Sequence, residues 1–402
     1  MHIVIVGAGH AGGTCAAQLR QNGFDGDITL IGAEPSPPYQ RPPLSKAWLK
    51  GEVEADALLL RPESFYADQR VTLRTGTEVT GLNRITKTLT LADGSSLGYD
   101  KLVLAAGVET RRLSLPGGDE PSLLSLRTAA DADRVRAAMV PGRHLILIGA
   151  GYVGLEVAAS ARQLGVEVTI IERQTRVLSR VASETLSRFF HDLHRRQGAV
   201  ILTNVEAKAI THQGRRVELA DGRVLEGDAI LVGIGSKPNK ILAEQAGLPV
   251  ADGIIVDETA RTLDEDVYAI GDCTNRPAFP YGVRLRLESV PNALEQAKQA
   301  AAAITGTKAP APEVPWFWSD QFDRKLQIAG LPLDASHQIV RGDPASGSFS
   351  VVHVRGQQVR CVEAVNAPAD FMGGRLLIAG GQLVDLNRLA DPDVPMKAVL
   401  AA

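Results

Sequence analysis

The clearest pattern of apolar and polar positions along the chain occurs twice, and it predicts two copies of one α/β unit. Each copy has a short apolar run, a glycine loop, an alanine-rich amphipathic stretch and a second apolar run, as expected for strand, loop, helix and strand. The loops begin at Gly7 and Gly149, and this spacing of 142 residues indicates that a whole unit is duplicated. The copies are HIVIVGAGHAGGTCAAQLRQNGFDGDITLIGAE at residues 2–34 and HLILIGAGYVGLEVAASARQLGVEVTIIER at residues 144–173.

Alternating apolar and polar positions predict hairpins elsewhere in the chain. Residues 87–91 and 99–105 flank Asp93-Gly94 and predict a hairpin that leads into a buried strand. The same arrangement recurs at residues 216–219 and 229–234, around Asp221-Gly222. Further along, the pattern predicts a strand within 254–273 that ends at 268–272, and a helix at 291–305. A proline-rich linker follows at 308–315. Beyond it, the pattern predicts an antiparallel sheet that contains 349–354 and 358–364.

Composition limits the classes of protein that fit this pattern. At roughly 150 residues per domain, 402 residues suggest two or three domains, and 45% hydrophobic residues suffice for a sizeable core. The net charge of −3 argues against nucleic-acid binding. The three cysteines form no metal-ligand pair and no disulfide framework, which fits a reducing cytoplasm. We expect no metal site, no signal peptide and no membrane span.

The glycine loops explain part of the high glycine content, 39 residues in 402. In a GxGxxG loop, the first glycine permits a tight turn, the second lets the backbone approach a pyrophosphate, and the third allows close packing of helix on strand. The helix N-terminus then offers free N–H groups and a positive dipole end to the phosphates. Because both loops follow an apolar strand and open a helix, we interpret both as dinucleotide-binding loops.

An acidic residue follows each unit at about the offset expected for a ribose-binding carboxylate. These residues are Glu34 and Glu172. A carboxylate at this position accepts hydrogen bonds from the ribose hydroxyls and repels a 2′-phosphate. Glu172 therefore favours NAD over NADP at the second site, although Arg173, Arg176 and Arg180 follow it and could accommodate a phosphate.

Several further segments give the chain a resemblance to a known family along essentially its whole length. The chain resembles the FAD-dependent, NADH-dependent ferredoxin reductases of bacterial P450 and ring-hydroxylating dioxygenase systems, the putidaredoxin reductase-like proteins. PPLSK and FWSD are specific to that family, whereas the GD motif is shared by many flavoprotein reductases. The segments are PYQRPPLSK at 38–46, AIGDC at 269–273, ESVPNA at 288–293 and PWFWSDQ at 315–321.

The resemblance implies a glutathione reductase-like α/β architecture, with two Rossmann-like dinucleotide-binding domains and an α+β C-terminal domain with an antiparallel sheet. The FAD domain would comprise 1–109 and 237–312, the NAD domain 110–236, and the C-terminal domain 313–402. Glu34 departs from the family, which often has the acidic residue one place earlier, and Ala106 stands where the family usually has threonine. The residues implied to bind FAD are Gly7, Gly9, Ala11, Gly12, Glu34, Arg41, Lys46, Val79, Ala106, Gly107, Arg127, Gly271, Asp272, Val290 and Trp318.

The resemblance also implies where the nicotinamide cofactor binds. Glu156, seven residues past Gly149 and expected on the first helical turn, would contact the nicotinamide amide and pair with Lys46. Trp318 would lie near the flavin ring, and with Lys46 and Glu156 it completes the candidate catalytic residues. The residues implied to bind NAD are Gly149, Gly151, Tyr152, Val153, Gly154, Glu156, Glu172, Arg180, Gly233 and Gly235.

The segment 41–46 also suggests the electron acceptor. Disulfide reductases of this fold carry a CxxxxC there, and NADH peroxidases and oxidases carry one redox cysteine, but this segment has no cysteine. Electrons must therefore pass outward one at a time, and a [2Fe–2S] ferredoxin is the natural acceptor. Two alternatives stay open: a rubredoxin reductase, and an NADH-sensing flavoprotein resembling apoptosis-inducing factor.

Overall fold

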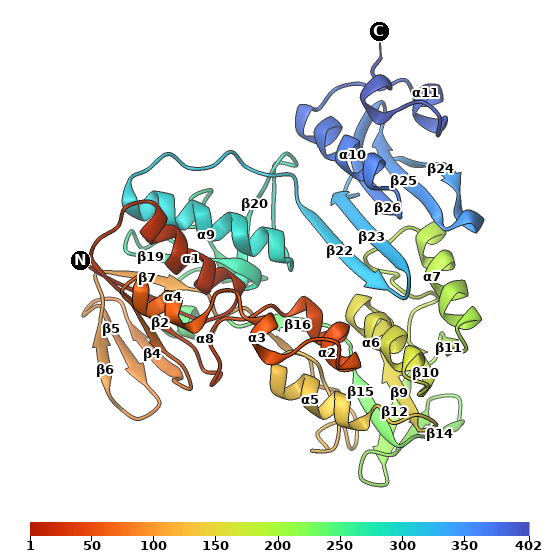
Figure 1. Ribbon diagram of the computed structural model, residues 1–402, viewed down its shortest axis with the longest axis horizontal. Coiled ribbons are helices and arrows are strands. Elements are labelled where there is room, and N and C mark those ends of the chain that lie inside the picture. The colour runs from red at the N-terminus through yellow and green to blue at the C-terminus, as the bar shows by residue number, and fades with distance from the viewer. Residues whose placement is uncertain (402) are drawn as a thin grey trace. The chain divides into compact units, whose positions relative to one another are not determined.

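The protein is described by a computed structural model that covers residues 1–401, and its chain divides into two compact units. Among the described residues, the first unit comprises 1–40, 55–109 and 237–317, and the second comprises 41–54, 110–236 and 318–401. Two of the boundaries between them fall within short strands, β8 (Val108–Thr110) and β16 (Ser236–Pro238). Figure 1 shows the elements of both units.

A parallel five-stranded sheet forms the centre of the first unit, in the order β19-β7-β1-β2-β3. Helices α1 (His10–Gln21) and α9 (Val290–Thr305) pack together, and their buried alanines and Leu19 share a core with Ile3 and Ile5 of the sheet. Small side chains on both helices permit this close approach. The strands are β1 (His2–Val6), β2 (Asp27–Ile31), β3 (Val71–Arg74), β7 (Lys101–Leu104) and β19 (Val267–Ala269).

Two smaller sheets and three short helices complete the first unit. The order β4-β5-β6 forms an antiparallel meander, whereas β17-β18-β20-β21 is mixed, since only β18 and β20 run parallel. The remaining elements are α3 (Ala55–Leu58), α4 (Glu63–Asp68), β4 (Val79–Asn83), β5 (Thr88–Leu91), β6 (Ser96–Gly98), α8 (Ile241–Gln245), β17 (Val250–Ala251), β18 (Gly253–Ile255), β20 (Thr274–Ala278) and β21 (Val283–Leu285).

The second unit is built around a parallel four-stranded sheet in the order β11-β10-β9-β15, with an antiparallel meander β12-β13-β14. Its central helix α6 (Tyr152–Gln163) is buried along most of its length. The other elements are η1 (Pro42–Ser45), α2 (Ala47–Lys50), α5 (Ala129–Ala138), β9 (His144–Ile148), β10 (Glu167–Glu172), α7 (Glu184–Arg196), β11 (Val200–Thr203), β12 (Ala207–Thr211), β13 (Arg216–Leu219), β14 (Val224–Glu226) and β15 (Ala229–Val232).

The C-terminal part of the chain forms a five-stranded sheet in the order β22-β23-β26-β25-β24. The pairs β23–β26, β26–β25 and β25–β24 are all antiparallel. Helix α10 packs on β23 and β26. The elements are β22 (Trp316–Gln321), β23 (Arg324–Gly330), β24 (His337–Asp343), η3 (Pro344–Ser346), β25 (Ser348–Arg355), β26 (Gln358–Val365), α10 (Pro368–Gly380), α11 (Leu386–Ala390) and η4 (Met396–Ala398).

The predicted fold class is confirmed: the chain forms two parallel sheets, in which a glycine loop follows β1 or β9, and a C-terminal antiparallel sheet. The strand predicted to end at 268–272 was partly wrong, because β19 stops at Ala269 and Gly271–Cys273 is the 3-10 helix η2. Gly271 has a φ of +80°, which a strand does not accommodate. Among residues 1–401, no helix combines the length and apolar character that a membrane crossing requires.

Candidate functional site

In the first glycine loop, the fold itself requires glycine at two positions, whereas a third position has free space beside it. Gly7 has a φ of +114°, and a Cβ there would lie 2.2 Å from the carbonyl oxygen of Ala105. A Cβ on Gly12 would lie 1.9 Å from the Gly7 carbonyl oxygen. Gly9, in contrast, would meet no described atom within 4 Å. This cradle fits a pyrophosphate at the N-terminus of α1, because backbone N–H groups are reachable only where no side chain stands.

The second loop repeats this arrangement. A Cβ on Gly149 would lie 2.5 Å from the Gly233 carbonyl oxygen, and one on Gly154 would lie 2.7 Å from the Gly149 carbonyl oxygen. Gly151 again meets nothing described within 4 Å. Val153, on the first turn of α6, is 48% exposed although it is apolar. The structure therefore brings the first and third glycines and Gly233 together around an open position that fits a second dinucleotide.

The two acidic residues occupy different places relative to their strands. Glu172 is the last residue of β10, and its Oε2 accepts a 2.8 Å hydrogen bond from the Ala150 N–H of the glycine loop. Glu34 lies three residues beyond the end of β2, and its carboxylate accepts a hydrogen bond from the Tyr39 hydroxyl. The carboxylate of Glu172 is thus held against its loop, as a ribose-binding carboxylate requires.

The three arginines after Glu172 have separate roles in the structure. Arg173 lies 3.8 Å from the carboxylate of Glu206 on the surface. Arg176 donates to the carbonyl oxygens of Ala182, Ser183 and Ser179, and so holds its own loop together. Arg180 approaches the loop after β15, since a Cβ on Gly235 would lie 3.6 Å from its guanidinium nitrogen. Of the three, Arg180 is the one that the structure brings to a predicted NAD residue.

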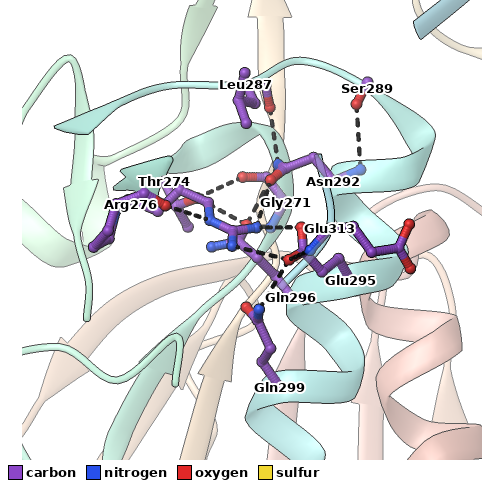
Figure 2. A network of polar contacts seen from close by, with 11 residues as sticks. Gly271, Thr274, Arg276, Leu287, Ser289, Asn292, Glu295, Gln296, Gln299 and Glu313 are labelled. Atoms are coloured by element: carbon purple, nitrogen blue, oxygen red, sulfur yellow. Dashed lines mark hydrogen bonds and ion pairs between the residues drawn. The ribbon is translucent and has the colours of Figure 1, made fainter. Parts of the chain in front are cut away.

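A buried polar network fixes the Gly271–Asp272 turn against α9 (Figure 2). The Gln296 side-chain oxygen accepts from the Gly271 N–H at 2.8 Å and from the Thr274 hydroxyl at 2.9 Å. Beside it, Arg276 forms an ion pair of 2.9 Å with Glu295, and both side chains are less than 10% exposed. A Cβ on Gly271 would touch Ala11 at 3.1 Å, so this turn lies directly against the first turn of α1.

The other predicted flavin residues of the first unit lie at the ends of its elements. Val79 begins β4, and Val290 begins α9, where the N–H groups of the first turn have no partner within the helix. Ala106 and Gly107 follow β7, and the Gly107 carbonyl oxygen accepts the Asn239 N–H at 3.0 Å. In the second unit, the Arg41 guanidinium donates to the Arg127 carbonyl oxygen, so the structure brings these two predicted residues together.

Lys46 and Glu156 form an ion pair in the second unit, with Nζ and Oε2 2.6 Å apart. The side chain of Glu156 is only 7% exposed, and that of Lys46 is 20% exposed. The expectation that Glu156 lies on the first turn was wrong: α6 begins at Tyr152, so Glu156 is the fifth helical residue and lies on the second turn. A charge buried within an apolar helix needs compensating donors, and the structure supplies them.

Two serines that sequence reasoning missed complete this carboxylate site. The Ser45 hydroxyl donates to Glu156 Oε2 at 2.5 Å, and the Ser319 hydroxyl donates to Oε1 at 2.7 Å. Ser319 and Gln321 are two residues apart on β22, so they share one face of the strand, and both are completely buried. This burial of polar residues at alternate positions is the signal that could have identified them. Trp318 lies on the opposite face of β22.

All three cysteine thiols are buried. Burial raises the pKa of Cys15 to about 12 and that of Cys273 to about 11, and it raises the pKa of Cys361 well above the ordinary value. We therefore expect the native protein to react with fewer than about one equivalent of a water-soluble thiol probe, since only an accessible thiolate attacks it. Denatured protein should react with all three thiols. Rapid labelling of the native protein would contradict this inert environment.

The comparisons with known proteins agree with this geometry. Residues 1–297 match the family described as pyridine nucleotide-disulphide oxidoreductase, and residues 316–400 match the reductase C-terminal family. The chain is 47% identical to the probable ferredoxin reductase CtmF of Castellaniella defragrans over 99% of this chain and 98% of the relative. It is 45% identical to the 5,5'-dehydrodivanillate O-demethylase ferredoxin reductase subunit of Sphingobium sp., over 99% and 98% of the two chains. A solved structure, that of the covalent putidaredoxin reductase–putidaredoxin complex, matches with a TM-score of 0.96 and 39% identity, covering 99% of this chain and 97% of that chain.

Proposed function

Since the chain belongs to the pyridine nucleotide-disulphide oxidoreductase family, we propose that it is a flavoprotein that passes electrons from NADH through FAD to a [2Fe–2S] ferredoxin. The ferredoxin would feed a cytochrome P450 or a ring-hydroxylating oxygenase. The observation that carries this proposal is the segment Arg41–Lys46, which contains no cysteine and ends in a lysine that pairs with Glu156. The relatives named ferredoxin reductases, similar over the whole chain, support the same acceptor.

We assign FAD binding to residues of the first unit and NADH binding to residues of the second. The Gly7–Gly12 loop, the Gly271–Asp272 turn and Val290 would hold FAD, which supplies the conversion from two-electron to one-electron transfer. The Gly149–Gly154 loop and Glu172 would hold NADH. Glu156 accepts a hydrogen bond from a serine on each oxygen, and this fixes the carboxylate that holds the Lys46 ammonium in place. A fixed positive charge favours a reaction in which negative charge develops beside it.

We also propose the domain assignment and the cellular location. The FAD domain comprises 1–109 and 237–312, the NAD domain 110–236, and the C-terminal domain 313–402. Three cysteines that are all buried and unpaired support a reducing compartment, the cytoplasm.

The test is a reconstitution with purified components. NADH should bleach the flavin of the protein under anaerobic conditions, and reduction of cytochrome c should require added ferredoxin. Full-rate turnover with oxygen or peroxide alone would overturn the proposal. A faster rate with rubredoxin than with ferredoxin would favour a rubredoxin reductase. A reduced protein that is reoxidised slowly by every carrier would favour an NADH-sensing flavoprotein.

The carboxylate of Glu172 gives a prediction about cofactor choice. Glu172→Gln keeps an oxygen for the Ala150 N–H but removes the charge that repels a 2′-phosphate, while Arg180 stays beside the site. We expect the preference for NADH over NADPH, measured as the ratio of the two kcat/KM values, to fall about tenfold. The exposed Glu184 of the same unit provides the control, since Glu184→Gln should leave the ratio unchanged. An unchanged ratio in Glu172→Gln would show that this carboxylate does not select the cofactor.

A further inference from the structure

A continuous line of hydrogen bonds runs through the second unit from Glu156 to a histidine on α7. Ser319 donates to Glu156 Oε1 at 2.7 Å, and Gln321 Nε2 donates to the Ser319 hydroxyl oxygen at 3.2 Å. The Gln321 oxygen then lies 2.9 Å from His194 Nε2. Ser319, Gln321 and His194 are each completely buried, so the line is isolated from water.

The carboxylate at one end determines the direction of every bond in this line. An ionised carboxylate only accepts hydrogen bonds, so Ser319 must donate its single proton to Glu156. The Ser319 oxygen is then left to accept, and the amide group of Gln321 must direct its NH₂ toward it. The Gln321 oxygen therefore faces His194, and His194 must carry its proton on Nε2.

The environment of His194 agrees with this assignment on independent grounds. Its Nδ1 is buried and has no hydrogen-bond partner within residues 1–401, as expected for an unprotonated nitrogen whose proton resides on Nε2. Burial, with a smaller contribution from the nearby His191, lowers the pKa of His194 to about 4. The ring also packs edge-on against Phe322, with centroids 5.0 Å apart. His194 is thus a neutral donor with one orientation.

We propose that His194 and Gln321 are positioning residues for the Lys46–Glu156 pair: His194 prevents the Gln321 amide from turning, and so reserves the Ser319 proton for Glu156. This rests on the proposed function of Glu156 at the nicotinamide site. If the His194 donor is removed, the buried Gln321 oxygen loses its partner and the amide turns it toward Ser319. Ser319 then donates to Gln321, and Glu156 loses one of its fixed donors although neither residue beside it has changed.

The kinetic test uses the flavin-loaded protein and NADH without ferredoxin, so it is independent of the acceptor. His194→Phe keeps the ring contact and removes the donor, and we expect the rate constant of flavin reduction at saturating NADH to fall about tenfold, with less than about a twofold change in the NADH concentration at half-saturation. His194→Gln places an NH₂ near the Nε2 position and should retain most of the rate. His191→Phe, on the same helix, should behave as the unchanged protein does.

A double variant tests whether the effect passes through Gln321. Gln321→Met removes the amide that turns, so His194→Phe combined with Gln321→Met should be faster than His194→Phe alone by about threefold. If His194 and Gln321 served only packing, the rate losses of the two single variants would multiply in the double variant. Multiplying losses, or a His194→Gln variant as slow as His194→Phe, would overturn the proposal.

The protonation of His194 gives a readout besides activity. In flavin-loaded protein labelled with ¹⁵N-histidine, the signal missing from His194→Gln identifies His194 among the eight histidines. At neutral pH, we expect proton couplings that show the Nε2–H tautomer. An Nδ1–H tautomer or a protonated ring would overturn the proposal. Failure of the protein to reduce any ferredoxin, with these results intact, would instead count against the proposed function.

Discussion

Gly12→Val is expected to yield no folded flavoprotein, whereas Gly9→Val is expected to yield a folded protein that has lost its flavin. A Cβ at position 12 would lie 1.9 Å from the Gly7 carbonyl oxygen, a backbone atom that cannot move without breaking the loop. Overpacking costs about 1–3 kcal/mol where neighbours can shift and more where they cannot. A Cβ at position 9 meets nothing described within 4 Å, and Gly9 has an extended backbone with φ of −89°, which valine tolerates.

The measurements are the yield of soluble protein, its melting temperature and the ratio of flavin to protein absorbance. Gly151→Val is the matched control, because the corresponding position of the second loop is equally open. This variant should keep its flavin and its melting temperature but lose most of its affinity for NADH. If Gly9→Val retained a full complement of flavin, the first loop would not be the place where the pyrophosphate binds.

Glu156→Gln is expected to slow NADH-driven flavin reduction about a hundredfold. The carboxylate accepts hydrogen bonds from Ser45 and Ser319 and pairs with Lys46, so each of its oxygens faces a donor. The amide of glutamine would place its NH₂ group against one of these donors. The substitution also removes the negative charge that compensates Lys46. Removing one partner of a buried ion pair also destabilises a protein, by about 3 kcal/mol.

Stopped-flow absorbance under anaerobic conditions measures the rate, and thermal unfolding measures the loss of stability. Glu167→Gln changes an exposed carboxylate at the start of β10 in the same unit, and both quantities should stay unchanged there. A rate in Glu156→Gln within about threefold of the unchanged protein would show that the Lys46–Glu156 pair supports only the structure.

Much of the fold could be predicted because its signals are local. The apolar runs and glycine loops predicted both strand–loop–helix–strand units, and the helix expected at 291–305 is confirmed as α9, Val290–Thr305. The end of β19 was less predictable. The apolar pattern continues to Ile270, but the positive φ of Gly271 turns the chain away from the sheet. The partners that hold this turn, Gln296 on α9 and Ala11 on α1, are distant from it in the chain.

The candidate site divides in the same way. By itself, the sequence determined which residues are fit to hold two dinucleotides and which segment lacks a redox cysteine, because these properties depend on residue type and on spacing within one unit. Only the tertiary structure decided that Arg180, of three arginines, lies beside Gly235, and that Ser45 and Ser319 join Lys46 around Glu156. Ser45 and Ser319 are 274 residues apart. No local pattern links such positions, because both serines reach Glu156 only in the folded chain, where the buried carboxylate needs hydrogen-bond donors.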